Sequence, residues 1–297
     1  MRVVKLSLLG IVISVAPAVA QDITPEEFEA QLGYQSGTIT LPDGIATINI
    51  PSDFRYIGKE GSQRLLTEAW GNPAEASTNV IGMLVPRDPS PLADDGWGII
   101  ITFDDNGYVN DDDAASINYE KLLEQMQDET KTSNEERQRL GYEPVTLIGW
   151  AEPPHYDATA HKLFWAKELK FGDEPTHTLN YCIRILGRRG VLELNAVSAM
   201  DKLSSIRENT PNVLASIEFN DGHRYSDFLH GKDKAAQYGV AGLIAGAAAV
   251  KVGFFKAALV AILALKKLLI VGVIALVALL RRVLGRRQKP TPAQPAS

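Results

Sequence analysis

The chain has 297 residues, a formal net charge of −6 and one cysteine, Cys182. All 36 Asp and Glu lie between residues 21 and 234, together with only 19 of the 30 Lys and Arg, so this range has a formal charge of −17. Such an acidic range argues against nucleic-acid binding, and a single cysteine excludes an internal disulfide and a multi-cysteine zinc site.

The first 20 residues have the three parts of a secretory signal peptide. Arg2 and Lys5 give a positive start, residues 6–15 form an apolar run, and Ala18-Val19-Ala20 is a small-x-small cleavage site. The apolar run is too short to cross a bilayer, which takes about 20 residues. The alternative is a buried N-terminal helix, but the order of the three parts favours a cleaved signal and an exported chain that begins at residue 21.

Residues 21–140 combine short helices with strand-like segments. The Thr24-Pro25 pair followed by two glutamates is typical of a helix start. The turn Pro42-Asp43-Gly44 between two short apolar runs predicts a β-hairpin. We expect helices over 21–33, 63–70 and 119–140, and strands over 38–41, 45–50, 80–85 and 97–103.

Residues 141–234 are richer in strands. Strands joined by short turns, with few helices between them, predict an α+β fold with a largely antiparallel sheet. About 214 residues can bury one core without disulfides, so we expect a single exported domain over 21–234, with Cys182 as a buried apolar residue. Strand-like segments lie at 145–151, 162–171, 176–186, 191–198 and 215–219, a helix is expected over 201–214, and 220–234 is a polar link.

The segment from 235 to 281 has the composition of a membrane anchor. It has no Asp or Glu and is rich in Ala, Leu, Val, Ile and Gly. At 100° per residue its four lysines fall within about 160° of one helical face. They either snorkel from a tilted helix, or form a stripe that faces partner subunits, acidic lipid headgroups or a polar groove. These lysines are Lys251, Lys256, Lys266 and Lys267.

A basic cluster begins at Arg281 and Arg282 and runs into a tail that ends at residue 297. The positive-inside rule places this cluster in the cytoplasm, while a cleaved signal places residue 21 outside. A single span satisfies both, whereas a hairpin of two spans would return the tail to the outside. We therefore expect a protein of the bacterial inner membrane, with 21–234 in the periplasm, 235–281 as the membrane segment and 282–297 in the cytoplasm.

Several local motifs resemble an uncharacterised family of bacterial membrane-anchored proteins, known only as a domain of unknown function. The resemblance covers nearly the whole chain and implies export and anchoring, but no activity and no catalytic residues. It rests on the lysine-bearing C-terminal segment and on the motifs Leu41-Pro42-Asp43-Gly44, Trp70-Gly71-Asn72-Pro73, Trp150-Ala151-Glu152-Pro153-Pro154-His155-Tyr156 and Gly187-Arg188-Arg189-Gly190-Val191-Leu192.

A looser resemblance concerns the fold alone. A hairpin leads into Ile50-Pro51-x-x-Phe54, and a late strand and helix lead into Ile217-Glu218-Phe219. This order is similar to the αβα sandwich shared by photosystem PsbP-type proteins and Mog-type Ran-binding proteins. The resemblance implies a sheet flanked by helices on both faces, in a domain that binds or assembles with partners.

The stretch from Trp150 to Asp157 is the most unusual local sequence. Its two prolines fix an extended backbone and disfavour a helix. Rings and charges on such a rigid loop are typical of a surface that binds a ligand or partner. The alternative is a structural crossover whose aromatic residues pack on the sheet. The binding candidates are Trp150, Glu152, His155, Tyr156 and Asp157.

Other candidates are weaker. Glu152 with His155 resembles an acid–base pair, and His155, His161 and His177 are possible metal ligands, although no ligand motif supports them. Arg188 and Arg189 either clamp a carboxylate or phosphate or form a solvated hairpin tip. The aspartates at 104–105 and 111–113 suggest calcium but fail the EF-hand spacing, and no cofactor is predicted.

These patterns favour a non-catalytic, membrane-anchored module that binds a protein partner or helps an envelope complex to assemble. Two alternatives remain. One is an envelope enzyme, a metal-assisted hydrolase that uses Glu152 and His155. The other is a self-assembling membrane protein whose lysine-bearing helix is the active part.

Overall fold

The computed structural model describes residues 23–72, 74–93, 95–139 and 141–246. The predicted signal peptide lies outside these residues. The lysines of the predicted anchor and the arginines that follow it also lie outside them: Lys251, Lys256, Lys266, Lys267, Arg281 and Arg282.

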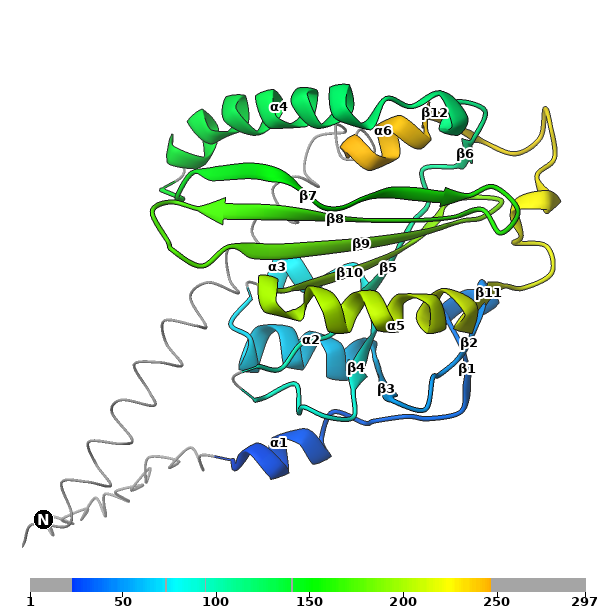
Figure 1. Cartoon of the computed structure of the whole chain (residues 1–297). Helices are drawn as coiled ribbons and strands as arrows, with labels where there is room; N and C mark the ends of the chain where they lie inside the picture. The colour runs from blue at the N-terminus through cyan, green and yellow to red at the C-terminus, as the bar shows by residue number, and fades with distance from the viewer. Residues whose placement is uncertain (1–22, 73, 94, 140, 247–297) are drawn as a thin grey trace, which may run out of the picture.

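A seven-stranded sheet forms the centre of the domain (Figure 1). Its order is β3-β4-β5-β10-β9-β8-β7, and all neighbouring strands are antiparallel. Successive side chains alternate between the two faces of the sheet, and both faces carry buried apolar residues. In β9, for example, Tyr181 and Ile183 pack on one face and Cys182 on the other. The strands are β3 Phe54–Gly58, β4 Val80–Pro86, β5 Ile99–Asp104, β7 Val145–Asp157, β8 Lys162–Phe171, β9 Thr178–Leu186 and β10 Val191–Ala199.

Two smaller sheets join distant parts of the chain. An antiparallel sheet of order β1-β2-β11 brings β11 (Ile217–Phe219) back to the N-terminal hairpin of β1 (Thr38–Thr40) and β2 (Ala46–Asn49). A parallel pair joins β6 (Tyr108–Asn110) to β12 (Ala235–Gly239). The C-terminal part of the domain is thus tied to two earlier segments.

Helices cover both faces of the large sheet. In Figure 1, α4 lies above strands β7 to β10 and α5 lies below them. The α5 side also carries the three-stranded sheet, while α2 and the π-helical turn after it cover the opposite face near β3 and β4. The helices are α1 Pro25–Ala30, α2 Lys59–Arg64, α3 Ala74–Ser77, α4 Tyr119–Arg139, α5 Leu203–Ser216 and α6 Val240–Ala245, and the π-helical turn is Leu65–Ala69.

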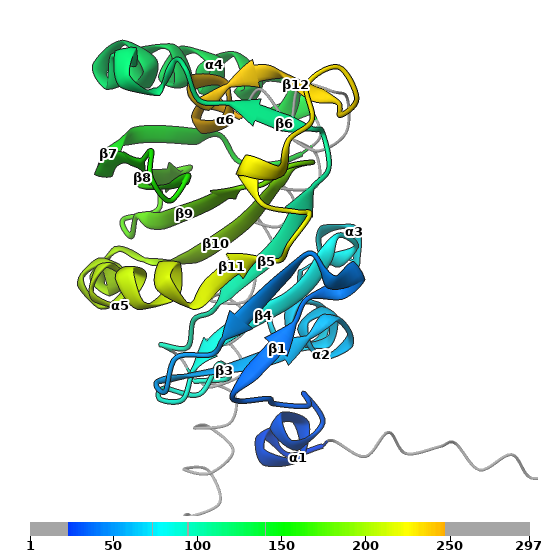
Figure 2. The ribbon, with the colours of Figure 1, turned by 90° about the vertical axis from the view of Figure 1, so that its right-hand side faces the viewer.

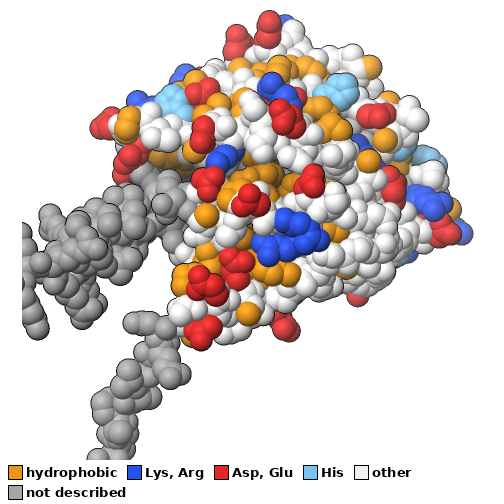
Figure 3. All heavy atoms as spheres, turned by 60° about the horizontal axis from the view of Figure 1, so that its bottom comes forward, with side chains coloured by type: hydrophobic (Ala, Val, Ile, Leu, Met, Phe, Trp, Pro, Cys, Tyr) orange, Lys and Arg blue, Asp and Glu red, His pale blue; other side chains and the backbone are white. Residues whose placement is uncertain are grey.

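The predicted fold class, α+β with a large antiparallel sheet flanked by helices, is confirmed. Figure 2 shows how strongly the sheet twists between its β7 and β3 ends, as expected for a sheet of this size. On the face shown in Figure 3, acidic and basic side chains are interspersed among apolar and neutral ones. Cys182 is buried, as predicted.

The predicted loop around Pro153-Pro154 is wrong, because both prolines lie inside β7. β7 is an edge strand, where a residue without an N–H group can be accommodated. The first half of its outer edge is covered by amide side chains of α4. Asn134 donates to the Val145 carbonyl and accepts from the Val145 N–H, both at 2.8 Å, and Gln127 donates to two further β7 carbonyls.

The folded domain extends past the boundary predicted at residue 234. β12 pairs with β6, and α6 buries Val240, Leu243 and Ile244 against the α4 side of the core. The composition of 235–245 misled the sequence interpretation, because an apolar run of this length suits a buried helix as well as a membrane helix. Within 23–246, where residues are described, no helix combines the length and apolar character needed to cross a membrane.

Candidate functional site

The stretch from Trp150 to Asp157 is divided between the two faces of the sheet. The pairing of β7 with β8 shifts between Trp150 and Glu152 and again between Glu152 and His155. Such shifts change which residues point to which face. Trp150 and Tyr156 pack toward α4, whereas Glu152, His155 and Asp157 line a groove on the α5 side.

This groove has a volume of about 470 Å³ and lies between α5 and the β7–β8 hairpin. One wall is the face of α5 from Arg207 to Ala215, which spans about 12 Å at 1.5 Å per residue. That length matches an extended segment of three or four residues. The lining residues are Glu152, His155, Asp157, Ala160, Lys162, Phe164, Tyr181, Arg207, Thr210, Pro211, Leu214 and Ala215.

The base of the groove is mainly aromatic and apolar. The His155 ring lies 5.2 Å from the Phe164 ring, centre to centre, and Phe164 is stacked near Tyr181 at 6.4 Å. His155 is exposed and Phe164 is partly buried. The groove therefore leaves rings open to solvent next to Pro211 and Leu214 of α5.

The charged groups of the groove are held by partners at its two ends. At one end, the Glu152 carboxylate accepts hydrogen bonds from Arg207 Nε at 3.0 Å and from the Tyr181 hydroxyl at 3.2 Å. Burial raises the pKa of Tyr181 well above its ordinary value. This hydroxyl therefore stays protonated near neutral pH and acts as a hydrogen-bond donor.

At the other end, Lys162 acts as a C-terminal cap of α5. Its ammonium donates to the carbonyls of Leu214 at 2.6 Å and Ile217 at 3.0 Å, and to the Glu218 carboxylate at 2.6 Å. A helix leaves its last carbonyls without intrahelical partners, and a cation there satisfies them. Lys162 thus joins the β7–β8 hairpin to the end of α5 and fixes the width of the groove.

The predicted acid–base pair does not form. Among the described residues, no hydrogen bond joins His155 to Glu152, whose carboxylate is bonded to Arg207 and Tyr181. The three histidines considered as metal ligands have different surroundings: His155 lies on Phe164, His161 contacts Asp111, and His177 contacts Glu168. Within the described residues, no three His, Cys, Asp or Glu side chains are placed to hold a metal ion.

On the opposite face, Asp111 gathers three side chains around its carboxylate. One oxygen accepts from the Tyr156 hydroxyl at 2.5 Å and contacts His161 Nδ1 at 3.2 Å. The other accepts from the Tyr225 hydroxyl at 2.9 Å. Because the ionised carboxylate only accepts, its contact with His161 requires the tautomer that carries a proton on Nδ1.

Electrostatics favour the ionised form of Asp111 and the neutral forms of Tyr156 and Tyr225. Burial acts to raise the pKa of Asp111, but the hydrogen bonds donated by Tyr156, Tyr225 and His161 outweigh it, and the pKa lies below its ordinary value. Burial, with hydrogen bonds to neighbouring groups, raises the pKa of Tyr156 and of Tyr225 far above the ordinary range. The rings also stack, with His161 3.9 Å from Tyr225 and Tyr225 4.4 Å from Tyr108.

The acidic loop suspected of binding calcium instead holds the C-terminal segment. The Asp113 carboxylate accepts from the N–H groups of Val240 and Ala241 at 2.9 and 3.0 Å, at the start of α6. Asp104 accepts from the Tyr238 hydroxyl at 3.1 Å. Negative charge at a helix start is favourable, so Asp113 and Asp104 both have a structural role.

The two arginines of the β9–β10 turn have different environments. Arg188 forms a two-pronged ion pair with Asp233, at 2.6 and 3.0 Å, and also donates to the Gly222 carbonyl. Arg189 is exposed. Arg188 therefore fastens the C-terminal segment to the sheet rather than standing free to clamp an anion.

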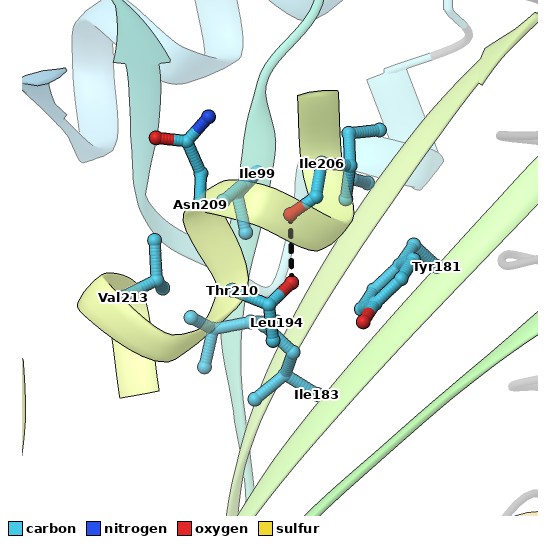
Figure 4. A pocket seen from close by; sticks show the side chains of 9 residues that line it. Ile99, Tyr181, Ile183, Leu194, Ile206, Asn209, Thr210 and Val213 are labelled. Carbon is cyan, nitrogen blue, oxygen red and sulfur yellow. Dashed lines mark hydrogen bonds between the residues drawn. The ribbon is translucent and has the colours of Figure 1, made fainter. Parts of the chain in front are cut away.

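A second cavity lies between α5 and the sheet, but it is very small. Figure 4 shows Ile99, Tyr181, Ile183, Ile206 and Thr210 around it, with the Thr210 hydroxyl donating to the Ile206 carbonyl at 2.8 Å. Its volume of about 10 Å³ is close to the minimum for one water molecule. It is a packing gap and not a ligand site.

Sequence reasoning missed the α5 wall of the groove. Arg207, Pro211 and Leu214 are spaced as one helical face, which is a usable signal. Nothing local indicates that this face lies opposite Glu152 and His155, because that contact depends on the strand order. The roles of Asp111 and Tyr225 were missed for the same reason, since they are 114 residues apart in the chain.

The fold and the site define an α+β domain that has an open groove and a C-terminal segment fastened to the sheet. The chain belongs to the family described as a protein of unknown function, DUF2167, whose model matches residues 33–277. No curated protein matches the chain.

Three solved structures resemble the chain weakly. The solution structure of cyanobacterial PsbP from Synechocystis sp. PCC 6803 has 11% identity and a TM-score of 0.35, and the match covers 64% of this chain and 94% of that one. LpqN, involved in cell envelope biogenesis of Mycobacterium tuberculosis, has 13% identity, a TM-score of 0.30 and coverages of 67% and 99%. The Saccharomyces cerevisiae Ran-binding protein Mog1p has 12% identity and a TM-score of 0.31, and the match covers 66% of this chain and 100% of that one.

Proposed function

We propose that this protein is a non-catalytic binding module of the bacterial envelope, in which the groove between α5 and the β7–β8 hairpin receives a short segment of a protein partner. The domain lies in the periplasm, and the acid-free segment that follows it holds it at the inner membrane. Support for this location comes from the sequence of the two ends: a signal-like start, an apolar segment and a basic tail.

One observation carries the choice of the groove. It leaves the His155–Phe164 ring pair open beside Pro211 and Leu214, and Glu152, Lys162 and Arg207 are already engaged with partners. Protein interfaces gain affinity by burying aromatic and apolar anchors in such hollows, surrounded by polar groups whose bonds are satisfied.

A cross-linking experiment on the full-length protein in its own membranes tests this proposal. A photo-reactive amino acid is placed at Ala215, which lines the groove, and in a control at Ser205, an exposed α5 residue that does not. We expect one discrete cross-linked protein from position 215 and none from 205. Equal labelling from both positions, or none from 215, would contradict the proposal.

A matched pair of substitutions adds a quantitative test. Ala215→Glu places a charge in the groove, and Ser205→Glu places the same charge elsewhere on the same helix. Burying an unpaired carboxylate against rings is costly, so Ala215→Glu should reduce partner recovery at least about tenfold, which corresponds to 1.4 kcal/mol. Ser205→Glu should leave recovery unchanged.

A further inference from the structure

Asp111 joins two parts of the domain that are far apart in the chain. On one side is the turn that closes one end of the groove, and on the other is the segment that leads out of the domain. We propose that these two parts are coupled through Asp111, so that a partner that displaces the turn loosens the C-terminal segment from the domain. This inference rests on the proposed function, because it treats the groove as the binding site.

The first part of the coupling is the turn between β7 and β8. Asp157 and Ala160 line the groove, and the Asp157 carboxylate shapes the turn by accepting from the N–H groups of Thr159 and Ala160 at 2.8 and 3.0 Å. Tyr156 and His161, which flank the same turn, are directed to Asp111 on the other face. Movement of this turn therefore changes the donors available to Asp111.

The backbone of this turn is held in an unusual conformation. His161 has a φ angle of 52°, in the left-handed region that few residues other than glycine adopt. Its carbonyl accepts from the Leu186 N–H at 2.9 Å, and its ring is stacked on Tyr225. The surrounding contacts maintain this conformation. When the turn is displaced, His161 can therefore adopt the negative φ angle that is usual for residues other than glycine.

The second part is the segment from Tyr225 to α6. The Tyr225 hydroxyl is held by Asp111 and by the Val109 carbonyl at 3.0 Å. Two residues further along the same loop, Asp113 holds the start of α6, and Gly239 pairs with Asn110. Residues 109–113 thus contact the C-terminal segment at several points.

The carboxylate of Asp111 makes the two parts interdependent. One oxygen serves Tyr156 and His161 and the other serves Tyr225, so rotation of the carboxylate affects both sets of bonds. A group shared in this way transmits a change in either direction, because coupling between two sites is reciprocal. The coupled states are the closed cluster seen here and a state in which Asp111 has lost one set of donors.

Hydrogen exchange of the full-length protein in lipid nanodiscs tests the coupling without a known partner. Asp157→Ala removes the two turn bonds and should raise exchange in 235–245 by about fivefold, at the low end of usual coupling factors. In an Asp111→Asn background the same substitution should add nothing further. Thr38→Val, which removes an exposed hydrogen bond to Asn49 in the small sheet, is the control and should leave 235–245 unchanged.

A substitution on the C-terminal side tests the coupling in the opposite direction and distinguishes it from a general loosening of the fold. Tyr225→Phe removes a single hydroxyl from the C-terminal side and should raise exchange in residues 156–164, while exchange in β4 stays unchanged. Faster exchange at 156–164 in Asp157→Ala with no change at 235–245 would overturn the inference, as would additive effects of Asp157→Ala and Asp111→Asn. Cross-linking at Ala215 reports the groove separately, so this coupling can fail while the binding proposal stands.

Discussion

The two faces of the β7–β8 hairpin differ in how completely their polar groups are used. On the α4 face, Asp111, Tyr156, His161 and Tyr225 form a closed cluster with hydrogen bonds and stacked rings. On the α5 face, the His155 ring is exposed along an open groove. One stretch of twelve residues, 150–161, supplies both faces, so its unusual composition reflects two separate tasks.

This difference suggests that the α4 face contributes to the stability of the fold and the α5 face to partner binding. Groups that satisfy one another inside a fold are costly to remove, because each loss leaves a partner unpaired. Exposed groups beside a hollow contribute little to stability and are free to contact another molecule. Substitutions on the two faces should therefore have opposite profiles, one affecting folding and the other affecting partner recovery.

The largest expected effect is on the closed face. Asp111→Ala removes the shared acceptor of Tyr156, His161 and Tyr225, although Tyr225 keeps the Val109 carbonyl as an acceptor. The free energy of unfolding should fall by about 2 kcal/mol, since each group left unpaired costs about 1 kcal/mol or more. Urea unfolding followed by tryptophan fluorescence measures this change. A loss below about 0.5 kcal/mol would show that the cluster does not stabilise the fold.

Acidification should produce a smaller effect at the same residue. The pKa of Asp111 lies below its ordinary value in the folded protein. Its contribution to stability is therefore complete above the unfolded pKa of about 4 and is lost as the pH falls through the folded pKa. Subtracting the stability–pH curve of Asp111→Asn from that of the natural protein isolates this contribution. The difference should shrink below about pH 4, and a difference that grows on acidification would contradict the assignment.

The smallest expected effects come from a matched pair of ring substitutions in β7. Tyr156→Phe removes one hydroxyl from the closed face and should cost about 1 kcal/mol of stability without reducing partner recovery. His155→Ala removes an exposed ring and should change stability by less than about 0.5 kcal/mol but reduce recovery. Thermal unfolding and the cross-linking yield from Ala215 measure the two quantities. The comparison fails if both variants lose stability and recovery together.

The sequence predicted the local features of the fold well. Turn residues such as Pro42-Asp43-Gly44 and the alternation of apolar residues indicated strands and an α+β sheet, because these signals act within a few residues. The prolines at 153–154 were wrongly read as a loop, since the sequence does not reveal that β7 lies at the edge of the sheet. The sequence likewise cannot show that α6 is buried beside α4.

The candidate site was predicted in part. Glu152, His155 and Asp157 do share a groove, but the α5 residues opposite them are contributed by a helix about 50 residues later. Trp150 and Tyr156 belong to the other face, and Glu152 departs from strict alternation because the pairing of β7 shifts on either side of it. Shifts of this kind depend on the partner strand, so no pattern within 150–157 indicates that Glu152 faces the groove together with His155 and Asp157.

The covered edge of β7 protects the domain against strand pairing between copies of the protein. An open sheet edge invites strand pairing and aggregation when copies of a protein meet at high local concentration. Asn134 and Gln127 occupy backbone groups in the first half of this edge, and Pro153 and Pro154 leave two residues in the second half of the strand without an N–H group. Neighbouring copies can then stand side by side without their sheets joining, and α5 and the groove remain accessible on each copy.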